Sequence, residues 1–257
     1  MIAYGEGFVD PDRWAVLENV VSLRSVPSSN ALGRDLIELY FDEDQTLRTT
    51  VLLAEAQPKA YGRGGHSWSA PEGRGLYLTI VRPVADGEPL SLVPIAAARW
   101  AAEVLREKTG VAVELKWPND LYAGRRKLAG VIAESRTQGD ATYLALGIGI
   151  NVSGKAGELG VENATTLEDE AGRALDRAAL LQALLDRFDR ELAAPRWSEE
   201  VREWERASLH RPGDRMTVHR NGEDVTGQYL GLDPSGFLRL RTENGEAVVS
   251  SGEVAAW

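Results

Sequence analysis

The 257-residue sequence contains no cysteine. This absence excludes a disulfide framework, a thiolate zinc site and a cysteine nucleophile. The three histidines, His66, His210 and His219, are scattered and do not form a metal-ligand spacing. No apolar run approaches the roughly 20 residues that span a bilayer, and residues 1–14 lack the apolar segment of a secretory signal. We therefore predict a soluble, cytoplasmic protein with no membrane partner.

A surplus of positive charge is also missing. Lys and Arg number 29 against 39 Asp and Glu, which gives a formal net charge of -10. Nucleic-acid binding relies on Lys and Arg that displace counterions from phosphates, so we predict no nucleic-acid partner. A local basic site for a small anion is still compatible with this charge. The 43% of hydrophobic residues is enough for a sizeable core.

Hydrophobic periodicity gives the expected elements. Helices are predicted at 28–40, 91–110, 177–192 and 198–208, and strands at 49–56, 75–81, 111–117, 127–135 and 142–150. Ser29 or Asn30 can cap the first helix, and Gly110 is a natural end for the second. The last two strands are joined too closely for a crossover helix, so they are predicted to pair antiparallel. The expected fold class is α/β of the α+β type, with a mixed central sheet flanked by helices.

The sequence changes character after residues 211–214. Short alternating strands are predicted at 215–220, 225–232, 237–241 and 247–251, separated by plausible tight turns. We therefore predict a catalytic or binding domain at 1–210 and a small all-β domain at 211–257.

Residues 116–130, "KWPNDLYAGRRKLAG", form a polar cluster between two predicted strands. A simple connector would contain Gly, Pro, Asn and Asp, and this segment has all four. The alternative is functional: Lys116 and Lys127 would lie at strand ends and face a ligand anion. Asp120 would then hold a divalent cation or orient a reacting group, because Mg²⁺ takes few carboxylates when substrate phosphates complete its shell.

Two glycine-rich stretches leave a similar choice. Residues 60–68, "AYGRGGHSW", suit a flexible surface loop or a phosphate cradle, with Trp68 as core or stacking platform. Residues 146–151, "LGIGIN", suit close packing of a strand or room for a flat ligand. Walker-type spacing is absent, which excludes an ordinary P-loop. Val152 stands where a dinucleotide fingerprint needs its third glycine, which argues against that site as well.

Taken together, these segments resemble the biotin protein ligase family, also called biotin–[acetyl-CoA carboxylase] ligases. The matching segments, in the family's order, are "SSN" (28–30), "AEAQ" (54–57), "GRGGHSW" (62–68), "GLYLTIVRP" (75–83), "KWPNDLY" (116–122), "KLAGVIAE" (127–134) and "GIGIN" (147–151). The resemblance covers roughly 22–257 and implies a C-terminal SH3-like β-barrel. It also implies the short form of the family, without an N-terminal DNA-binding domain.

The resemblance implies a reaction in two steps. The biotin carboxylate attacks the α-phosphate of ATP, which gives biotinyl-5′-AMP and pyrophosphate. A lysine amine of a biotin carboxyl carrier protein domain then attacks the mixed anhydride and releases AMP. ATP and biotin are substrates in this scheme, Mg²⁺ assists, and a homodimer is compatible with the family.

Roles for individual residues follow from the same resemblance. The catalytic set would be Lys127, Arg63, Asp120 and Lys116, with Asp120 also as the metal ligand. Biotin would contact Ser28, Ser29, Asn30, Gln57, Gly62, Gly65, Lys127 and Gly130. ATP and the adenylate would contact Arg63, Trp68, Asn119, Lys127, Gly149 and Asn151. Arg63 would order the glycine loop (residues 60–68) over the adenylate, and Trp68 would stack on adenine.

The chain departs from the family pattern at the glycine loop. Ala60 and Tyr61 stand where many members carry a Gly-Arg pair, and Gly64 replaces a frequent Arg. One cationic contact is lost, and Tyr61 can offer only a hydroxyl or a ring.

Two alternatives stay open. A lipoyl or other acyl-adenylate transferase shares the architecture. A non-catalytic biotin or adenylate sensor, with the C-terminal domain as partner surface, belongs to a different class. The cluster of Lys116, Asp120 and Lys127 favours the enzyme.

Overall fold

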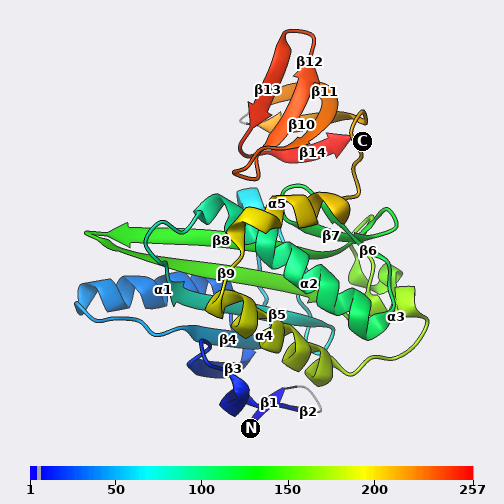
Figure 1. Ribbon diagram of the computed structural model, residues 1–257. Coiled ribbons are helices and arrows are strands. Elements are labelled where there is room, and N and C mark those ends of the chain that lie inside the picture. Colours follow the sequence, from blue (N-terminus) through cyan, green and yellow to red (C-terminus); the bar gives the residue numbers. More distant parts are fainter. Residues whose placement is uncertain (5–6, 221, 257) are drawn as a thin grey trace.

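A seven-stranded mixed sheet forms the centre of the computed structural model, which describes residues 1–4, 7–220 and 222–256 (Figure 1). In spatial order its strands are β3 (Asn19–Ser25), β4 (Thr50–Ala56), β5 (Gly75–Pro83), β9 (Ala141–Asn151), β8 (Arg126–Gln138), β7 (Asp120–Ala123) and β6 (Val113–Lys116). The β3–β4 pair is parallel and every other pair is antiparallel, so the predicted mixed sheet is confirmed. The predicted antiparallel pairing of β8 with β9 is confirmed too.

Helices cover the two faces of the sheet unequally. The helices are α1 (Ser29–Asp42), α2 (Val93–Thr109), α3 (Leu167–Ala171), α4 (Arg177–Ala193) and α5 (Trp197–Arg206). On β5, Leu78 belongs to the main core with Trp100 of α2 and Phe188 of α4. The next residues alternate: Val81 points to the opposite face and packs with Ile37 of α1. Among the described helices, α1 alone packs on that second face, which leaves room for a cavity beside it.

The predicted helices and strands are present, with small shifts at their ends. Ser28 is the N-cap of α1 and accepts from the Ala31 amide at 3.3 Å, while Gly110 ends α2 with φ 78°. The segment 116–130 is more than a connector, because β7 runs through it and pairs with both β6 and β8. Turn residues lie on both sides of the buried Leu121, so the short strand β7 fits between β6 and β8. A short N-terminal hairpin, β1 (Ile2–Tyr4) and β2 (Gly7–Val9), completes the domain.

The C-terminal strands form a separate sheet in the order β13 (Gly245–Val249), β12 (Leu238–Thr242), β11 (Glu223–Leu232), β10 (Arg215–Arg220) and β14 (Glu253–Ala256). Within the described residues, β13 and β14 are opposite edges of this sheet and do not pair with each other. Over these residues the sheet is therefore not closed into the expected barrel, because the four-residue β14 pairs with β10 on one side only. Trp257, the last residue of the predicted domain, lies outside the described residues.

The C-terminal sheet lies next to α5 (Figure 1), and hydrogen bonds join it to the rest of the chain there and at the β6–β7 turn. The Trp117 indole donates to the Gly236 carbonyl at 3.0 Å, and the Leu232 amide donates to Glu205 of α5 at 2.7 Å. Trp117 is buried, so the sheet covers the β6–β7 turn and brings its loops above the same face that α1 leaves open.

Candidate active site

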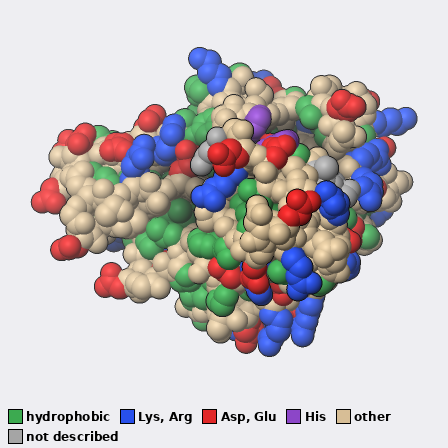
Figure 2. Space-filling model, turned by 90° about the horizontal axis from the view of Figure 1, so that it is seen from above, with side chains coloured by type: hydrophobic (Ala, Val, Ile, Leu, Met, Phe, Trp, Pro, Cys, Tyr) green, Lys and Arg blue, Asp and Glu red, His purple; other side chains and the backbone are tan. Residues whose placement is uncertain are grey.

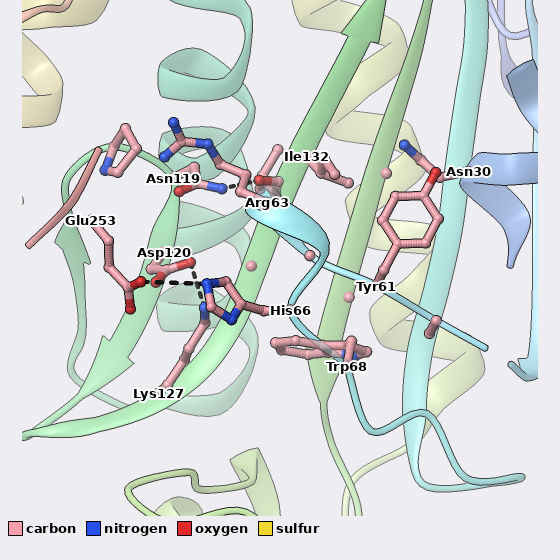
Figure 3. A pocket seen from close by; sticks show the side chains of 18 of the residues that line it. Asn30, Tyr61, Arg63, His66, Trp68, Asn119, Asp120, Lys127, Ile132 and Glu253 are labelled. Atoms are coloured by element: carbon pink, nitrogen blue, oxygen red, sulfur yellow. Dashed lines mark hydrogen bonds and ion pairs between the residues drawn. The ribbon is translucent and has the colours of Figure 1, made fainter. Parts of the chain in front are cut away.

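A cavity of about 520 Å³ lies on the open face of the central sheet, between the glycine loop and the C-terminal sheet (Figure 3). Cavities of this volume suit small-molecule ligands. Its lining includes Ser28, Ser29, Asn30, Gln57, Tyr61, Gly62, Arg63, Trp68, Lys116, Asn119, Asp120, Lys127, Gly130, Gly149, His219, Arg220 and Glu253. Segments far apart in the chain thus meet in one place.

Glycines of β9 form the floor of the cavity. Side chains from other segments occupy the space that a side chain at these positions would need. A Cβ at Gly149 would lie 2.9 Å from the Trp68 indole, and one at Gly147 would lie 2.2 Å from Asn30 Oδ1. Gly130 of β8 adjoins the same place, with Asp120 and Trp68 near its missing Cβ. Close packing, one of the two explanations that the sequence left open for these glycines, therefore applies to Gly147 and Gly149. The residues that pack against them, Asn30 and Trp68, also line the cavity.

One end of the cavity is built from neutral hydrogen-bonding groups. The Ser29 amide, in the first turn of α1, donates to Gln57 Oε1 at 2.6 Å. The Thr79 hydroxyl lies 2.8 Å from Ser29 Oγ and 3.0 Å from Asn30 Oδ1. These side chains are all buried. They can recognise a polar but uncharged ring system, because each buried group has directional donors or acceptors.

The other end is cationic. Lys127 Nζ lies 2.8 Å from Asp120 Oδ1 and 5.7 Å from the centre of the Trp68 ring. Backbone pairing fixes this lysine: its amide donates to the Asn163 carbonyl at 2.7 Å, and its carbonyl accepts from Thr165 at 2.9 Å. Figure 3 shows Lys127 and Asp120 facing each other from neighbouring strands beside Trp68.

The β6–β7 turn positions two further side chains. The Val131 amide donates to the Asn119 carbonyl at 3.0 Å, and Asn119 Nδ2 donates back to the Val131 carbonyl. Asn119 therefore fixes the turn to β8, and Asp120 follows directly. Lys116, at the end of β6, is buried and lies 5.3 Å from the centre of the Tyr122 ring.

Charges in the cavity contrast with those of the whole chain. The described lining carries four cationic side chains, Arg63, Lys116, Lys127 and Arg220, and two carboxylates, Asp120 and Glu253. The chain as a whole carries -10. Figure 2, which views the molecule from the side of the C-terminal sheet, shows acidic and basic side chains intermixed over that face. The local excess of positive charge therefore indicates an anion site.

Burial lowers the pKa of two of these cations. Desolvation lowers the pKa of Lys116, and the neighbouring Lys127 lowers it further, while Asp120 opposes the change. Desolvation likewise lowers the pKa of Arg63, against the attraction of Asp120 and Glu253. A bound polyanion would oppose both shifts, because a nearby negative charge favours the protonated form of each cation.

The glycine loop contacts the C-terminal sheet directly. Arg63 Nη1 donates to the Gly252 carbonyl at 3.2 Å, and His66 Nε2 lies 3.7 Å from Glu253 Oε2. His219, Arg220 and Glu253 were not predicted for the site. They come from β10 and β14, 70 residues or more beyond Gly149, the last of the other lining residues named above, and no local pattern marks them.

Two predicted site residues, Gly65 and Asn151, do not line this cavity. Asn151 is buried, and its Nδ2 donates to the Thr165 carbonyl at 3.1 Å, next to the contact that fixes Lys127. Its predicted contact with adenine stays a prediction, as does that of Gly65 with biotin. The other predicted residues line the cavity together.

Metal binding by protein groups alone finds no support among the described residues, where no three His, Asp or Glu side chains gather for an ion. Asp120 gives one carboxylate next to the cationic end of the cavity. That arrangement suits Mg²⁺ held partly by substrate phosphates, which needs only one or two protein carboxylates. Over the same described ranges, no helix is long and apolar enough to cross a membrane.

Two family models match the chain. The Biotin/lipoate A/B protein ligase family model matches residues 25–151, and the Biotin protein ligase C terminal domain model matches residues 213–257. The first spans the glycine loop, the β6–β7 turn and all of β8 and β9, and the second spans the C-terminal sheet.

Curated relatives agree with the family models. The chain is 31% identical over 229 residues to a Biotin--[acetyl-CoA-carboxylase] ligase of Mycobacterium tuberculosis, covering 79% of this chain and 77% of that protein. It is 34% identical over 204 residues to the Bifunctional ligase/repressor BirA of Escherichia coli, covering 74% and 61%. The chain spans 50–65% of the length of this and three other bifunctional relatives.

Solved structures extend the likeness to the fold. A mutant biotin protein ligase of Aquifex aeolicus in complex with biotin has a TM-score of 0.75, with 28% identity over 93% of this chain and 97% of that chain. The same organism's enzyme in complex with biotin and ATP has a TM-score of 0.71, with 27% identity over 93% and 98%. The chain therefore belongs to the biotin protein ligase family.

Proposed function

We propose that the protein activates biotin with ATP and transfers it to a lysine of a biotin carrier domain. The observation that carries this proposal is the Lys127–Asp120 pair, 2.8 Å apart, at the cationic end of a cavity whose other end has buried neutral donors and acceptors. A ligand with a polar ring at one end and an anionic group at the other matches both ends.

The neutral end would hold the ring system of biotin. Ser28, Ser29, Asn30 and Gln57 carry the hydroxyls and amides that can pair with a ring carbonyl and ring N–H groups. The chain of the ligand would pass Gly62 and Gly130, with Gly65 on the outer side of the loop. Its carboxylate would then reach Lys127.

The adenylate would lie at the cationic end. Trp68 would stack on the base beside Gly149, and Asn119 and Asn151 would contribute polar contacts. When the biotin carboxylate oxygen bonds to the α-phosphorus, the bond to pyrophosphate breaks, and both reactants are anions. Lys127, Lys116 and Arg63 would offset their repulsion and the charge that develops on the transferred phosphate. Mg²⁺, held by Asp120 and the phosphates, would add positive charge to the leaving pyrophosphate.

The second step needs a neutral amine. The incoming lysine would attack the acyl carbon of the mixed anhydride, AMP would leave, and the amine would lose a proton. Asp120 lies next to the reacting position and would orient the amine or accept its proton. Enclosure of the cavity by the glycine loop would keep water away from the anhydride in the meantime.

Several wider features belong to the same proposal. Residues 1–210 would be the catalytic domain, and residues 211–257 an SH3-like module that supplies one wall of the cavity. The protein would act in the cytoplasm, without nucleic acid or membrane, and a homodimer would be compatible with this role.

The decisive experiment combines the purified protein with biotin, ATP, Mg²⁺ and a carrier domain, and follows avidin-detectable label. Biotin-dependent exchange of pyrophosphate into ATP isolates the first step. Lys127→Ala should reduce that exchange at least about a hundredfold, as loss of a transition-state cation does. Absence of label on every carrier would refute the proposal, exchange with lipoate but not biotin would favour a lipoyl enzyme, and binding without exchange would favour a sensor.

A further inference from the structure

Tyr61 begins residues 61–67, the part of the glycine loop that we call the lid loop. Tyr61 and Ser67 form an isolated antiparallel bridge, and the Gly62 amide donates to the His66 carbonyl at 2.7 Å. Within the loop, Gly64 and Gly65 have φ of 66° and 78°, a conformation that other residues rarely adopt. The loop is thus a short exposed excursion whose two ends meet at Tyr61.

The Tyr61 side chain turns away from solvent toward the sheet. Its hydroxyl donates to Glu134 Oε2 at 2.9 Å, and the Arg34 guanidinium lies 5.7 Å from the centre of its ring. Burial and the Glu134 carboxylate raise the pKa of Tyr61 to about 12, so the phenol stays a donor over the physiological range. Figure 3 shows Tyr61 on the Asn30 side of the loop, with Arg63 on the other.

Glu134 joins Tyr61 to the neutral end of the cavity. The same carboxylate accepts from Asn30 Nδ2 at 2.6 Å and pairs with Arg34 at 3.2 Å. Asn30 Oδ1 in turn lies 3.0 Å from the Thr79 hydroxyl, which also contacts Ser29. A continuous series of hydrogen bonds therefore runs from the base of the lid loop to the buried hydroxyls of Thr79 and Ser29 at the neutral end of the cavity.

The lid loop has a second, outer attachment, through Arg63 and His66 to the C-terminal sheet. That attachment uses Arg63, the side chain expected to grip the adenylate phosphate. If Arg63 Nη1 turns to a ligand, its contact with Gly252 is lost, and the inner attachment at Tyr61 still holds the loop.

From this geometry we infer that Tyr61 is a positioning residue, which anchors the lid loop to Glu134 and so retains the acyl-adenylate between the two steps. The inference rests on the proposed function for its chemistry. It does not assign Tyr61 any contact with reacting atoms. Tyr61 stands where many family members carry an arginine. In place of that cation it supplies a phenol that donates to Glu134 and a ring that faces Arg34.

The experiment compares Tyr61→Phe with Tyr143→Phe. Each change removes one phenol hydroxyl from a hydrogen bond, but Tyr143 accepts from the Leu47 amide at 3.1 Å in the α1 core and does not line the cavity. The main readout is the ratio of biotinyl-AMP released into solution to biotin placed on the carrier. We expect Tyr61→Phe to raise that ratio about tenfold, because a hydrogen bond to a carboxylate is lost. Tyr143→Phe should lower the melting temperature and leave the ratio unchanged.

Glu134→Gln gives a second test, since the amide keeps an acceptor but loses the charge. We expect a smaller rise in the ratio with Glu134→Gln, because a neutral acceptor holds the phenol less strongly. Adding Glu134→Gln to Tyr61→Phe should raise the ratio no further, because without the phenol hydroxyl no bond to position 134 is left to weaken. An unchanged ratio in Tyr61→Phe, or equal rises in Tyr61→Phe and Tyr143→Phe, would overturn the inference.

Hydrogen exchange in the unliganded protein separates this inference from the proposed function. The Gly62 amide should exchange about tenfold faster in Tyr61→Phe, and at the wild-type rate in Tyr143→Phe. If the wild-type protein forms no biotinyl-AMP, the proposed function fails while this readout still tests the anchor. If exchange at Gly62 is unaltered, the anchor is refuted whatever the enzyme does.

Discussion

The indole of Trp68 occupies the space that a side chain at Gly149 would need. A Cβ built on Gly149 would lie 2.9 Å from Cε2 and Nε1 of that indole, closer than packed atoms tolerate. Trp68 follows the lid loop, whereas Gly149 lies in the middle of the sheet. The absence of a side chain at Gly149 therefore sets the depth at which the indole rests in the cavity.

Gly149→Ala should displace Trp68 and weaken nucleotide binding. The added methyl group meets a ring at the edge of a loop, so we expect the loop to shift and the fold to lose no more than about 1–3 kcal/mol. The KM for ATP should rise more than the KM for biotin. Steady-state kinetics and thermal melting would check this, with Gly157→Ala as the control, because a Cβ at Gly157 has nothing within 4 Å. Equal effects on both substrates would contradict the assignment of Trp68 to the nucleotide.

Strong local patterns account for the part of the fold that the sequence predicts. In α2 a periodic run ends at Gly110, and in β8 and β9 apolar runs are separated by two turn residues, so periodicity and turn chemistry agree. In the central sheet, the strands that were not predicted, β3 and β7, lack such patterns. β3 is an exposed edge strand, and β7 has only four residues between two turns.

Local residue patterns pointed to the site only where one segment carries several of its residues, whereas Ser28, Gln57 and Gly149 were expected from the family resemblance. Lys116, Asp120 and Lys127 lie within one segment, and the turn that brings them together is visible in the sequence. Arg220 and Glu253 depend on how a second sheet docks, which is decided by contacts such as that of Trp117 with Gly236. The hydrophobic periodicity of a sequence does not indicate how one sheet packs against another.

Asp120→Asn should separate the two steps. The amide keeps the size of the side chain but loses the charge that pairs with Lys127 at 2.8 Å and that would accept a proton from the incoming amine. We expect transfer from presynthesised biotinyl-AMP to a carrier to fall about a hundredfold or more. Rapid-quench kinetics of each step would measure this. Equal losses in both steps would instead assign Asp120 chiefly to the metal or to the position of Lys127.

His210 should make stability depend on pH. It is 1% exposed and lies 6.0 Å from the Tyr229 ring, and desolvation, helped by Lys116, lowers its pKa from 6.5 to about 4. The folded state thus holds His210 neutral where the unfolded chain already binds a proton. Stability is complete above about pH 6.5 and falls as pH decreases toward 4, by at most about 3 kcal/mol.

Urea unfolding at pH 7 and pH 4.5 would measure this contribution. Carboxylates also titrate in that range, so the informative quantity is the difference between wild-type protein and His210→Phe, which cannot bind the proton. We expect the variant to lose less stability than wild type between the two pH values. A parallel loss in both proteins would show that His210 is not responsible.

Arg220→Ala should weaken ATP binding and leave biotin binding intact. Arg220 lines the cavity from the C-terminal sheet. Its charge would attract the triphosphate, so the KM for ATP should rise several-fold in the variant and depend less on salt than in wild type. Arg239→Ala is the matched control, because Arg239 pairs with Glu246 on the exposed side of the same sheet. A similar change in both variants would mean that the effect comes from the net charge of the C-terminal sheet. An unchanged KM for ATP in Arg220→Ala would show that this sheet does not contribute to the nucleotide site.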